Sequence, residues 1–483
     1  MSTDSLLGPA SQFGVVLAPG TVLDGFRLEQ RLHQGGMANI WSVTRVQALA
    51  GEDFPLIMKV PRIKGGEDPA TIVGFEVEQM LMPALKGPHV PRFVARGDWT
   101  RQAYIVMEAI PGSSLRPRLS AAPLAVDEVV DIGVRVALAL HALHRQHVIH
   151  LDVKPSNIMF RPDGTAVLVD FGLSRHEHLP DLLEEEFTLP MGTGPYMSPE
   201  QIQFVRNDPR SDLFALGVML YHLATGQRPF GAPDTVRGLR RRLYTEPIPP
   251  SAHNPAIPPW LQEIILRCLE VDPAKRHPSA AQLALDLRQP MGVQLTARAH
   301  KRKASGGWNQ LRRWVAAIGA EPVTSQATEQ LARSPITMVA LDVDNASPAL
   351  LEQIRDAARR AVRTSPGARL ACVDVLKTSR IAMDELTDSQ GQSKHVKQLI
   401  ALKHWARPLA QELQLDDGRL TFHVLEAPDP GDALIDFAAK CGADHIIVGA
   451  RGNSGSPHPL GSVATQVLSE AECSVTVVRV KKI

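Results

Sequence analysis

The spacing of apolar positions changes once along the first 300 residues. Between about residues 24 and 110, short β-type runs dominate, and one helical stretch over residues 70–85 interrupts them. We expect strands at 26–32, 40–46, 55–60 and 103–108. From residue 125 apolar residues recur at helical spacing, and we expect helices at about 126–148, 211–225, 259–269 and 280–288. The pattern predicts a β-rich part followed by a mostly helical part.

A second rhythm begins at residue 336. Apolar strand-like runs alternate with amphipathic helical stretches as far as a last strand over 474–480. Gly442 is expected to end one of these helices, because glycine tolerates the left-handed conformation that often follows a helix. Strands that alternate with helices predict a parallel, doubly wound α/β sheet.

The length of 483 residues corresponds to about three compact units at a typical ~150 residues per domain. We predict a flexible N-terminus over 1–20, a first domain over 21–290, a basic and polar linker over 291–335 and a last domain over 336–483. We expect the first domain to divide into lobes of about 21–110 and 111–290.

The formal net charge of +1 argues against a general nucleic-acid binder, which would carry a strong basic excess. The HKRK run at 300–303 could contact a nucleic acid or a membrane, but a solvated linker is the preferred interpretation. We therefore predict neither nucleic acid nor membrane as a partner.

The N-terminus shows no signal-peptide pattern, and no run of 18 apolar residues suggests a membrane span. The four cysteines have no CxxC spacing, which fits small buried side chains in a reducing compartment. We expect a soluble, cytoplasmic protein.

Candidate chemistry begins with HLDVKPSN at 150–157, which lies between a long apolar helix and a short apolar strand. Thirteen residues after Asn157 come Asp170, Phe171 and Gly172, behind another apolar run. Phosphoryl transfer needs a metal-bound triphosphate and a positioned nucleophile, but little covalent help from the protein. Asn157 and Asp170 fit the metal-ligand roles, and Asp152 fits the base.

At this point the sequence resembles the bacterial eukaryotic-like Ser/Thr protein kinases over about residues 22–290. The motifs stand in that family's order: LHQGGMANIW (32–41), LIMK ending at Lys59, FEVEQMLMPAL with Glu78, VMEAIPGSSL (106–115), HLDVKPSN, DFG (170–172), GTGPYMSPE (192–200), SDLFALG (211–217) and Arg276.

The resemblance implies an α+β bilobal protein-kinase fold and a non-specific serine/threonine protein kinase that uses ATP with Mg²⁺ or Mn²⁺. It implies that Asp152 accepts the proton of the acceptor hydroxyl and that Lys154 steadies the γ-phosphate. Lys59 would contact the α- and β-phosphates and pair with Glu78. The nucleotide-binding positions that it implies are Leu32, Gly35, Gly36, Ile40, Lys59, Met107, Glu108, Ile110 and Met159.

Other residues of the same motifs are implied to hold the second lobe together. Asp212 would anchor the catalytic loop, Glu200 would pair with Arg276, and Thr193 would contact the catalytic loop. Thr188 in the activation segment is a candidate autophosphorylation site.

The sequence departs from the kinase pattern at several positions. His33 and Ala38 replace glycines of the glycine-rich loop, and Ile57 adds bulk to the roof of the adenine pocket. These departures motivate the alternative of a pseudokinase that senses ATP and acts as a scaffold in stress signalling.

Leu151 replaces the arginine that in many kinases pairs with a phosphate on the activation segment, so activity should depend less on such phosphorylation. Glu184, Glu185 and Glu186 could mimic a phosphorylated loop, but a solvated face is the preferred interpretation.

The stretch from 336 onward resembles the universal stress protein family, on its Gly-punctuated end and its last strand, SVTVVRV. The glycines and the start of the helix at 462 could expose backbone N–H groups to phosphate. The nucleotide positions that the resemblance implies are Asp342, Gly449, Gly452, Gly461 and Ser462, although Val343 and Asp344 replace the usual Gly-Ser.

The last strand could pair with its copy in a second chain, so we predict a possible homodimer through this domain. We expect the domain to sense nucleotide or stress, or to recruit partners. The predicted whole is an active kinase for Ser and Thr in protein substrates, fused to an α/β doubly wound parallel-sheet universal-stress-protein domain.

Overall fold

The computed structural model describes residues 17–34, 38–47, 54–62, 69–187, 189–233, 235–303, 335–365, 367–378, 393–415, 418–450 and 461–480. These residues form two compact units, which we describe separately. The first contains the described residues up to Val73, Val94–Glu108 and those after Ala332, and the second contains Gly74–Phe93 and the described residues from Ala109 to Leu331. Predictions at Gly35, Gly36, Thr188 and Gly452, and over most of the N-terminus and linker, lie outside the described residues.

The N-terminal part of the first unit is a six-stranded sheet with the order β1-β2-β3-β4-β6-β5. Its strands are β1 (Val22–Leu23), β2 (Phe26–Gln34), β3 (Ala38–Arg45), β4 (Leu56–Pro61), β5 (Phe93–Gly97) and β6 (Tyr104–Glu108). The four predicted strands are confirmed, while β1 and β5 were not predicted. One face buries a cluster of apolar residues that includes Phe26, Leu28 and Trp41. The helix predicted at 70–85 is α1 (Pro69–Leu81).

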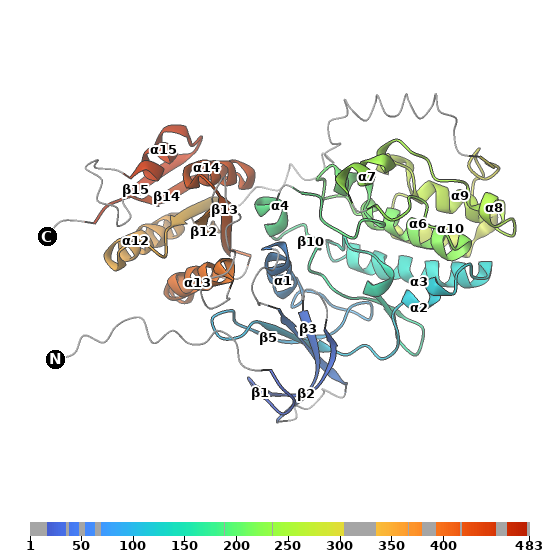
Figure 1. Ribbon diagram of the computed structural model, residues 1–483, viewed down its shortest axis with the longest axis horizontal. Coiled ribbons are helices and arrows are strands. Elements are labelled where there is room, and N and C mark those ends of the chain that lie inside the picture. The colour runs from blue at the N-terminus through green and yellow to red at the C-terminus, as the bar shows by residue number, and fades with distance from the viewer. Residues whose placement is uncertain are drawn as a thin grey trace. The chain divides into compact units, whose positions relative to one another are not determined.

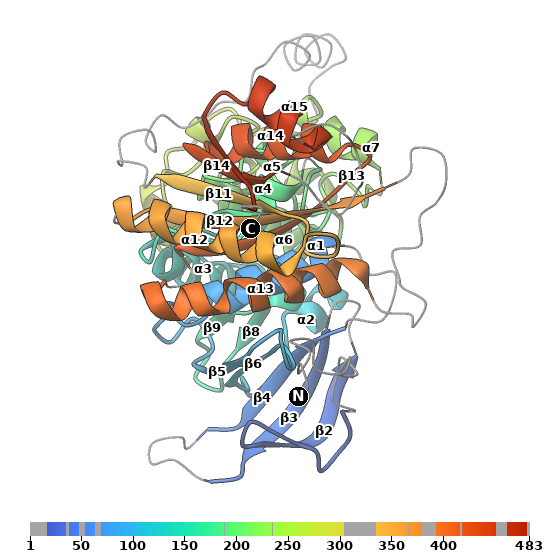
Figure 2. The same ribbon diagram turned by 90° about the vertical axis from the view of Figure 1, so that its left-hand side faces the viewer.

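The C-terminal part of the first unit is a separate five-stranded sheet with the order β13-β12-β11-β14-β15, and all its pairings are parallel. The strands are β11 (Ile336–Leu341), β12 (Arg369–Lys377), β13 (Leu420–Ala427), β14 (His445–Gly449) and β15 (Ser474–Val478), and the helices are α12 (Pro348–Thr364), α13 (Lys394–Leu413), α14 (Pro430–Cys441) and α15 (Ser462–Glu470). Figure 2 shows α12 and α13 on one face and α14 and α15 on the other. The doubly wound sheet is therefore confirmed, and Gly442 ends α14 with a left-handed φ of 67°.

The second unit is mostly helical, and Figure 1 shows its helices in the cyan to yellow part of the chain. Its helices are α2 (Arg116–Ser120), α3 (Val126–His144), α4 (Leu182–Glu186), α5 (Pro199–Ile202), α6 (Arg210–Thr225), α7 (Val236–Arg240), α8 (Pro250–His253), α9 (Pro259–Cys268) and α10 (Ala280–Arg288). Short elements complete it: β7 (Val148–Ile149), β8 (Ile158–Phe160), β9 (Ala166–Leu168), β10 (Arg175–His176), η1 (Pro155–Asn157), η2 (Arg241–Leu243), η3 (Pro273–Lys275) and η4 (Pro290–Gly292). Helix α6 is buried along nearly its whole length and packs against α3 and α9. The four long helices that the apolar spacing predicts are confirmed.

A buried ion pair holds two distant segments of the second unit together. The Arg276 guanidinium binds both carboxylate oxygens of Glu200 at 2.6 Å. It also donates to the carbonyl oxygens of Arg210, Glu270 and Val271 and lies over the Phe214 ring. The predicted pairing is confirmed, and every hydrogen-bonding direction of a buried guanidinium is used.

Within the predicted linker, Thr296–Lys301 contacts α9, while His300, Arg302 and Lys303 of the HKRK run are exposed. The buried Gln262 side chain donates to the carbonyl oxygens of Arg298, Ala299 and Lys301, and buried Glu263 accepts from Thr296 and Arg298. These polar positions on α9 need partners once they are buried. The start of the predicted linker supplies those partners and packs against α9. Among the described residues, no helix combines the length and the apolar character that crossing a bilayer requires.

The Glu200–Arg276 pair supports a stability prediction. We expect Arg276→Gln to lower the free energy of unfolding by about 3–5 kcal/mol, because the Glu200 carboxylate stays buried without its partner. Urea unfolding of the full chain measures this change.

The matched control is Arg118→Gln, which breaks the exposed Arg118–Glu128 pair. Exposed pairs contribute less than about 1 kcal/mol, so this variant should unfold close to wild type. Equal losses in the two variants would contradict the importance of the buried pair.

Candidate active site

One carboxylate on α6 fixes the loop that carries the candidate chemistry. Asp212 is buried and accepts hydrogen bonds from the backbone N–H groups of His150 and Leu151, both at 2.9 Å. Its Oδ2 also lies 2.9 Å from Nε2 of His144. The predicted anchoring role of Asp212 is therefore confirmed. Because Leu151 has a positive φ of 59°, these two bonds hold a backbone conformation that a leucine rarely adopts.

The loop that Asp212 holds brings four polar side chains together. Thr193 donates to Oδ1 of Asp152 at 2.7 Å, and the Lys154 ammonium lies 2.6 Å from Oδ2 of Asp152. Lys154 also donates to the Thr193 hydroxyl at 3.0 Å. The amide of Asn157 donates to both Oδ2 and the carbonyl oxygen of Asp152. The contact predicted for Thr193 is confirmed, and the Asp152 carboxylate is held in one orientation by three neighbours.

Helix α1 and the Asp170–Gly172 turn touch through their backbones. A Cβ atom on Gly74 would lie 3.0 Å from the carbonyl oxygen of Gly172, so glycine permits this close approach. Phe171 is fully buried beside the ring of His150. Asp170 has a positive φ of 68°, and Glu78 on α1 is buried.

The segment that closes the site, 192–201, is tied to the catalytic loop by side chains. Gln201 completes a capping box with Ser198 and donates to the Leu151 carbonyl oxygen at 2.7 Å. The buried Arg242 guanidinium donates to the carbonyl oxygens of Gly194 and Met197. Burial lowers the pKa of Arg242 to about 10, which leaves it charged at neutral pH. Sequence reasoning missed Arg242, because its partners lie far from it along the chain.

Asp181 holds the activation segment (residues 176–194) by an ion pair. Its carboxylate lies 2.8 Å from Nε of Arg206 and 3.6 Å from Nε of Arg175, and it caps the N-terminus of α4. Arg206 also donates to the Leu173 carbonyl oxygen. Burial raises the pKa of Glu184, one of the three glutamates that sequence reasoning considered as a phosphate mimic. Asp181, which sequence reasoning did not consider, makes this contact with arginine.

The positions implied for nucleotide binding lie in both units. In the first unit, Lys59 on β4 is opposite Ile40 on β3 and Ile105 on β6 in the strand register. On the same sheet, Met107 is buried opposite Ile57, whereas Leu32 on β2 is exposed.

Glu108 ends β6 in the first unit and is buried. In the second unit, Ile110 is buried, and Met159 on β8 bridges to Ser114. Apart from Ile110, these residues stand on strands, which are rigid places from which to hold a ligand.

In the C-terminal domain, Asp342 and Gly449 end neighbouring parallel strands at one edge of the sheet. Asp342 accepts from the backbone and side chain of Asn345, which is a local turn role. A Cβ on Gly449 would lie 3.0 Å from Cδ2 of Leu350, so the packing of α12 also favours glycine there. Gly461 caps α15, which begins at Ser462, without a side-chain hydrogen bond.

A buried carboxyl at the same edge was missed by sequence reasoning. Asp374 on β12 stands opposite Leu341, and its Oδ2 has no hydrogen-bond partner among the described residues. Burial, together with the negative charges of Asp342 and Asp344, raises the pKa of Asp374 to about 7. In the sequence, Asp374 is marked only by its place as an aspartate inside the apolar run RLACVDVL, and it was not considered as a candidate site residue.

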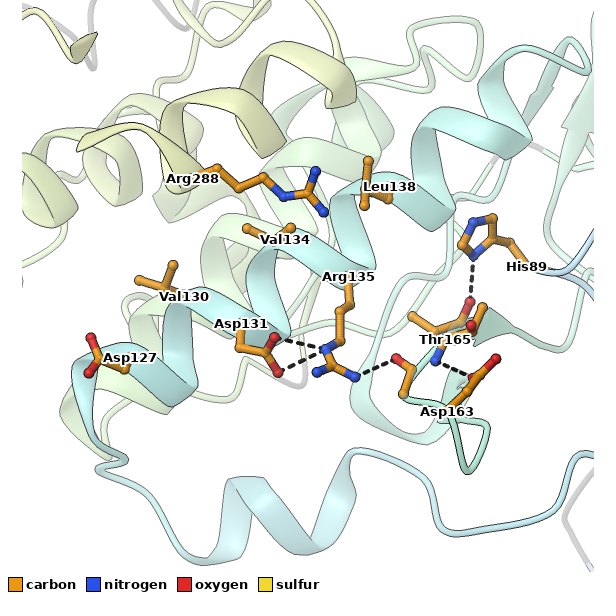
Figure 3. Close-up of a pocket in the computed structure, with 12 residues that line it drawn as sticks. His89, Asp127, Val130, Asp131, Val134, Arg135, Leu138, Asp163, Thr165 and Arg288 are labelled. Atoms are coloured by element: carbon orange, nitrogen blue, oxygen red, sulfur yellow. Dashed lines mark hydrogen bonds and ion pairs between the residues drawn. The ribbon is translucent and has the colours of Figure 1, made fainter. Parts of the chain in front are cut away.

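A cavity of about 580 Å³ lies beside α3 and the β8–β9 hairpin, away from the catalytic loop (Figure 3). Arg135 lies across it, because its guanidinium pairs with Asp131 and donates to the Gly164 carbonyl oxygen. None of the predicted site residues lines this cavity in the described part of the chain.

Two family models match the chain. The model of the protein kinase domain matches residues 58–286, and that of the universal stress protein family matches residues 335–479. The first match begins after the glycine-rich segment that departs from the kinase pattern.

Similar proteins include a probable serine/threonine-protein kinase PknB of Lactococcus lactis subsp. lactis, which is 29% identical over 271 residues, covering 55% of this chain and 42% of that protein. The serine/threonine-protein kinase PknB of Mycobacterium tuberculosis (strain H37Rv) is 30% identical over 274 residues, covering 56% of this chain and 43% of that protein. The chain thus spans less than half the length of these relatives. A solved mutant of the Mycobacterium tuberculosis PknI kinase domain is 24% identical, has a TM-score of 0.43 and covers 58% of this chain and 100% of that one.

The raised pKa of Asp374 leads to a pH prediction. Because its folded-state pKa exceeds the unfolded value of 3.8, its contribution to stability is present below that value and is lost as the pH rises to about 7. We therefore expect the free energy of unfolding of Asp374→Asn, minus that of wild type, to rise between pH 3.8 and about pH 7. The rise should be up to ~1.4 kcal/mol for each pH unit. Unfolding of the full chain at several pH values measures the difference.

The control is Asp436→Asn, which changes an exposed aspartate on α14. Its stability relative to wild type should be the same across the window. A pH-independent difference for Asp374→Asn would contradict the raised pKa.

Proposed function

Because the chain carries a protein kinase domain followed by a universal stress protein domain, we propose that it is an ATP-dependent kinase of serine and threonine hydroxyls in proteins. The observation that carries the proposal is the cluster of Asp152, Lys154, Asn157 and Thr193. A general base must be oriented and within reach of an acceptor hydroxyl, and three neighbours orient Asp152. The similarity to bacterial Ser/Thr kinases supports the same conclusion.

We propose that Asp152 accepts the proton of the acceptor hydroxyl while its oxygen attacks the γ-phosphorus of ATP. The bond from that phosphorus to the bridging oxygen of ADP breaks, and ADP leaves with the electron pair. Lys154, 2.6 Å from Asp152, is close enough to stabilise negative charge on the transferred phosphoryl group. Thr193 contacts both residues and would help to position a hydroxyl acceptor.

Asn157 and Asp170 are the residues that would hold the divalent metal. Their amide and carboxylate oxygens are the donors that Mg²⁺ prefers, so the donor set fits Mg²⁺, with Mn²⁺ as the alternative. When bound, the metal would neutralise charge on the phosphates. Asn157 is prepared for this role, since its amide nitrogen donates to Asp152 and its Oδ1 accepts a hydrogen bond from the Ser156 hydroxyl.

The nucleotide-binding positions in the N-terminal sheet, including Lys59, and the pairing of Lys59 with Glu78 remain part of the proposal. The C-terminal domain is proposed to sense nucleotide or stress. Its edge strand β15 pairs only with β14 among the described strands, which supports the proposed homodimer. The cytoplasmic location and the domain boundaries stay predictions.

We further propose that the kinase needs no phosphate on its activation segment. Leu151 stands where an arginine would bind such a phosphate, and Asp181 already supplies a carboxylate to Arg206 and Arg175. A buried ion pair between the segment and Arg206 thus takes the place of one that phosphorylation would create.

The test of the activity is label transfer from [γ-³²P]ATP with Mg²⁺ by the full chain. We expect wild type to label itself or a generic Ser/Thr substrate, and Asp170→Ala and Lys59→Met to lose at least about 100-fold of this rate. Circular dichroism checks that both variants stay folded.

Equal labelling by wild type and Asp170→Ala would overturn the proposed activity. ATP binding in a thermal-shift assay without any transfer under varied metals would instead favour the pseudokinase scaffold. Asp163→Ala, an exposed position beside the cavity of Figure 3, serves as the matched aspartate control and should label normally.

Asp181→Asn tests the role of the ion pair in the activation segment. We expect kcat to fall by about tenfold or more, a loss of about 1.4 kcal/mol in transition-state stabilisation, with less change in KM for ATP. Steady-state kinetics before and after phosphatase treatment measure this. Loss of wild-type activity on phosphatase treatment would contradict the proposed independence from phosphorylation.

A further inference from the structure

Three metal-ligating side chains gather on the surface of the second unit, outside the candidate active site. They are His147, in the turn between α3 and β7, and Glu177 and His178, which follow β10. One ligand atom from each lies within 4.8 Å of the others, and all three residues are exposed. None of the proposed catalytic or nucleotide-binding roles uses them.

The backbone fixes this gathering. Strand β7 pairs with β10, with Ile149 opposite Arg175 and Val148 opposite His176. The ladder continues into the cluster, because the Glu177 N–H donates to the His147 carbonyl oxygen at 2.9 Å. The rings of His147 and His178 lie 4.8 Å apart between centroids. The three side chains are therefore brought together by strand pairing and do not depend on chance contacts of long surface side chains.

The backbone at His147 adds to this placement. Its φ is 59°, a left-handed conformation that is uncommon for histidine. Left-handed backbone in a non-glycine residue is often retained at sites with a function. Here it directs the chain back into β7 immediately after α3.

One carboxylate and one imidazole of the cluster already face each other. Nδ1 of His147 lies 2.8 Å from Oε2 of Glu177. Imidazole nitrogens and carboxylate oxygens are both common metal ligands in proteins.

We propose that His147, Glu177 and His178 form a binding site for a divalent ion of the zinc type, with water in the fourth position. Two imidazoles and one carboxylate form a three-residue donor set that Zn²⁺ takes up in proteins, whereas Mg²⁺ prefers oxygen ligands. Zinc bonds of about 2.0–2.2 Å require ligand atoms ~3.4 Å apart. Ligand atoms that lie up to 4.8 Å apart must therefore approach by up to about 1.4 Å, and the His147 and Glu177 atoms at 2.8 Å must separate slightly.

The site would join two functionally different segments. His147 lies three residues before His150 at the start of the catalytic loop, and Glu177 and His178 belong to the activation segment. A bound ion would clamp the first part of the activation segment to the chain that leads into the catalytic loop. The proposal concerns metal binding itself and does not depend on kinase activity.

The test uses the full chain after removal of metals by dialysis against a chelator. Zn²⁺ is titrated in competition with a chromophoric chelator, which reports both stoichiometry and affinity. We expect wild type to bind one equivalent that His178→Ala loses or binds at least about tenfold more weakly. His147→Asn, which keeps a residue that tolerates the left-handed conformation, should behave in the same way.

The control is His404→Ala, which removes an exposed histidine on α13 in the other unit and should bind Zn²⁺ as wild type does. Co²⁺ gives a second readout, since visible absorption bands of a bound His₂Glu site should appear in wild type and vanish in His178→Ala. Circular dichroism confirms that the variants are folded. Identical zinc affinity and stoichiometry in wild type, His178→Ala and His147→Asn, or no zinc binding by wild type, would overturn the proposal.

Discussion

The organisation of the candidate active site depends on the buried carboxylate of Asp212. Its two oxygens accept from consecutive backbone N–H groups, those of His150 and Leu151. Leu151 has a left-handed backbone conformation, which costs a non-glycine residue free energy. The two hydrogen bonds to Asp212 offset this cost. These bonds come from the first turn of α6, which is buried along nearly its whole length. The position of α6 therefore fixes the position of Asp152. The loop that carries Asp152 is thus held rigid by a buried helix and does not depend on contacts within the loop itself.

The same construction recurs in the segments around this loop. Glu200, Arg242 and Asp181 each place a buried charge where backbone groups or an opposite charge satisfy it. Burying a charge costs free energy unless its partners are in place. Each of these charges is therefore stable in its buried position only when the segments that supply its partners are folded as well. The segments that must be ordered for the proposed phosphoryl transfer are therefore ordered by polar contacts inside the second unit. This explains why a chain with almost no net charge can still concentrate charged groups at one site.

The sequence predicted the elements that have a clear period and the contacts that belong to a motif. The helical spacing over 126–148 and the strand–helix alternation after 336 are strong signals, since many positions agree with one period. Strand β5, with the sequence FVARG, was missed because five residues with an arginine and a glycine show no alternation. Arg242 and Asp181 were missed for a different reason, because their partners lie 45 and 25 residues away and no local pattern marks them. Asp374 could have been found, since an aspartate inside an apolar strand is unusual in itself.

In the C-terminal five-stranded sheet, Gly449 and the neighbouring aspartates have structural roles that the motif-based expectation did not include. At Gly449 the close approach of Leu350 on α12 already favours a residue without a Cβ, so packing is one reason for the glycine before any ligand is considered. At the neighbouring strand ends, Asp342, Asp344 and Asp374 bring three carboxyl groups together. Burial, with a smaller contribution from the other two charges, raises the pKa of Asp374. A triphosphate brought to this edge would meet repulsion unless a cation or a proton came with it. A nucleotide that binds at this acidic edge would therefore have to bind together with a cation or a proton. The catalytic loop differs, because Lys154 supplies a positive charge there.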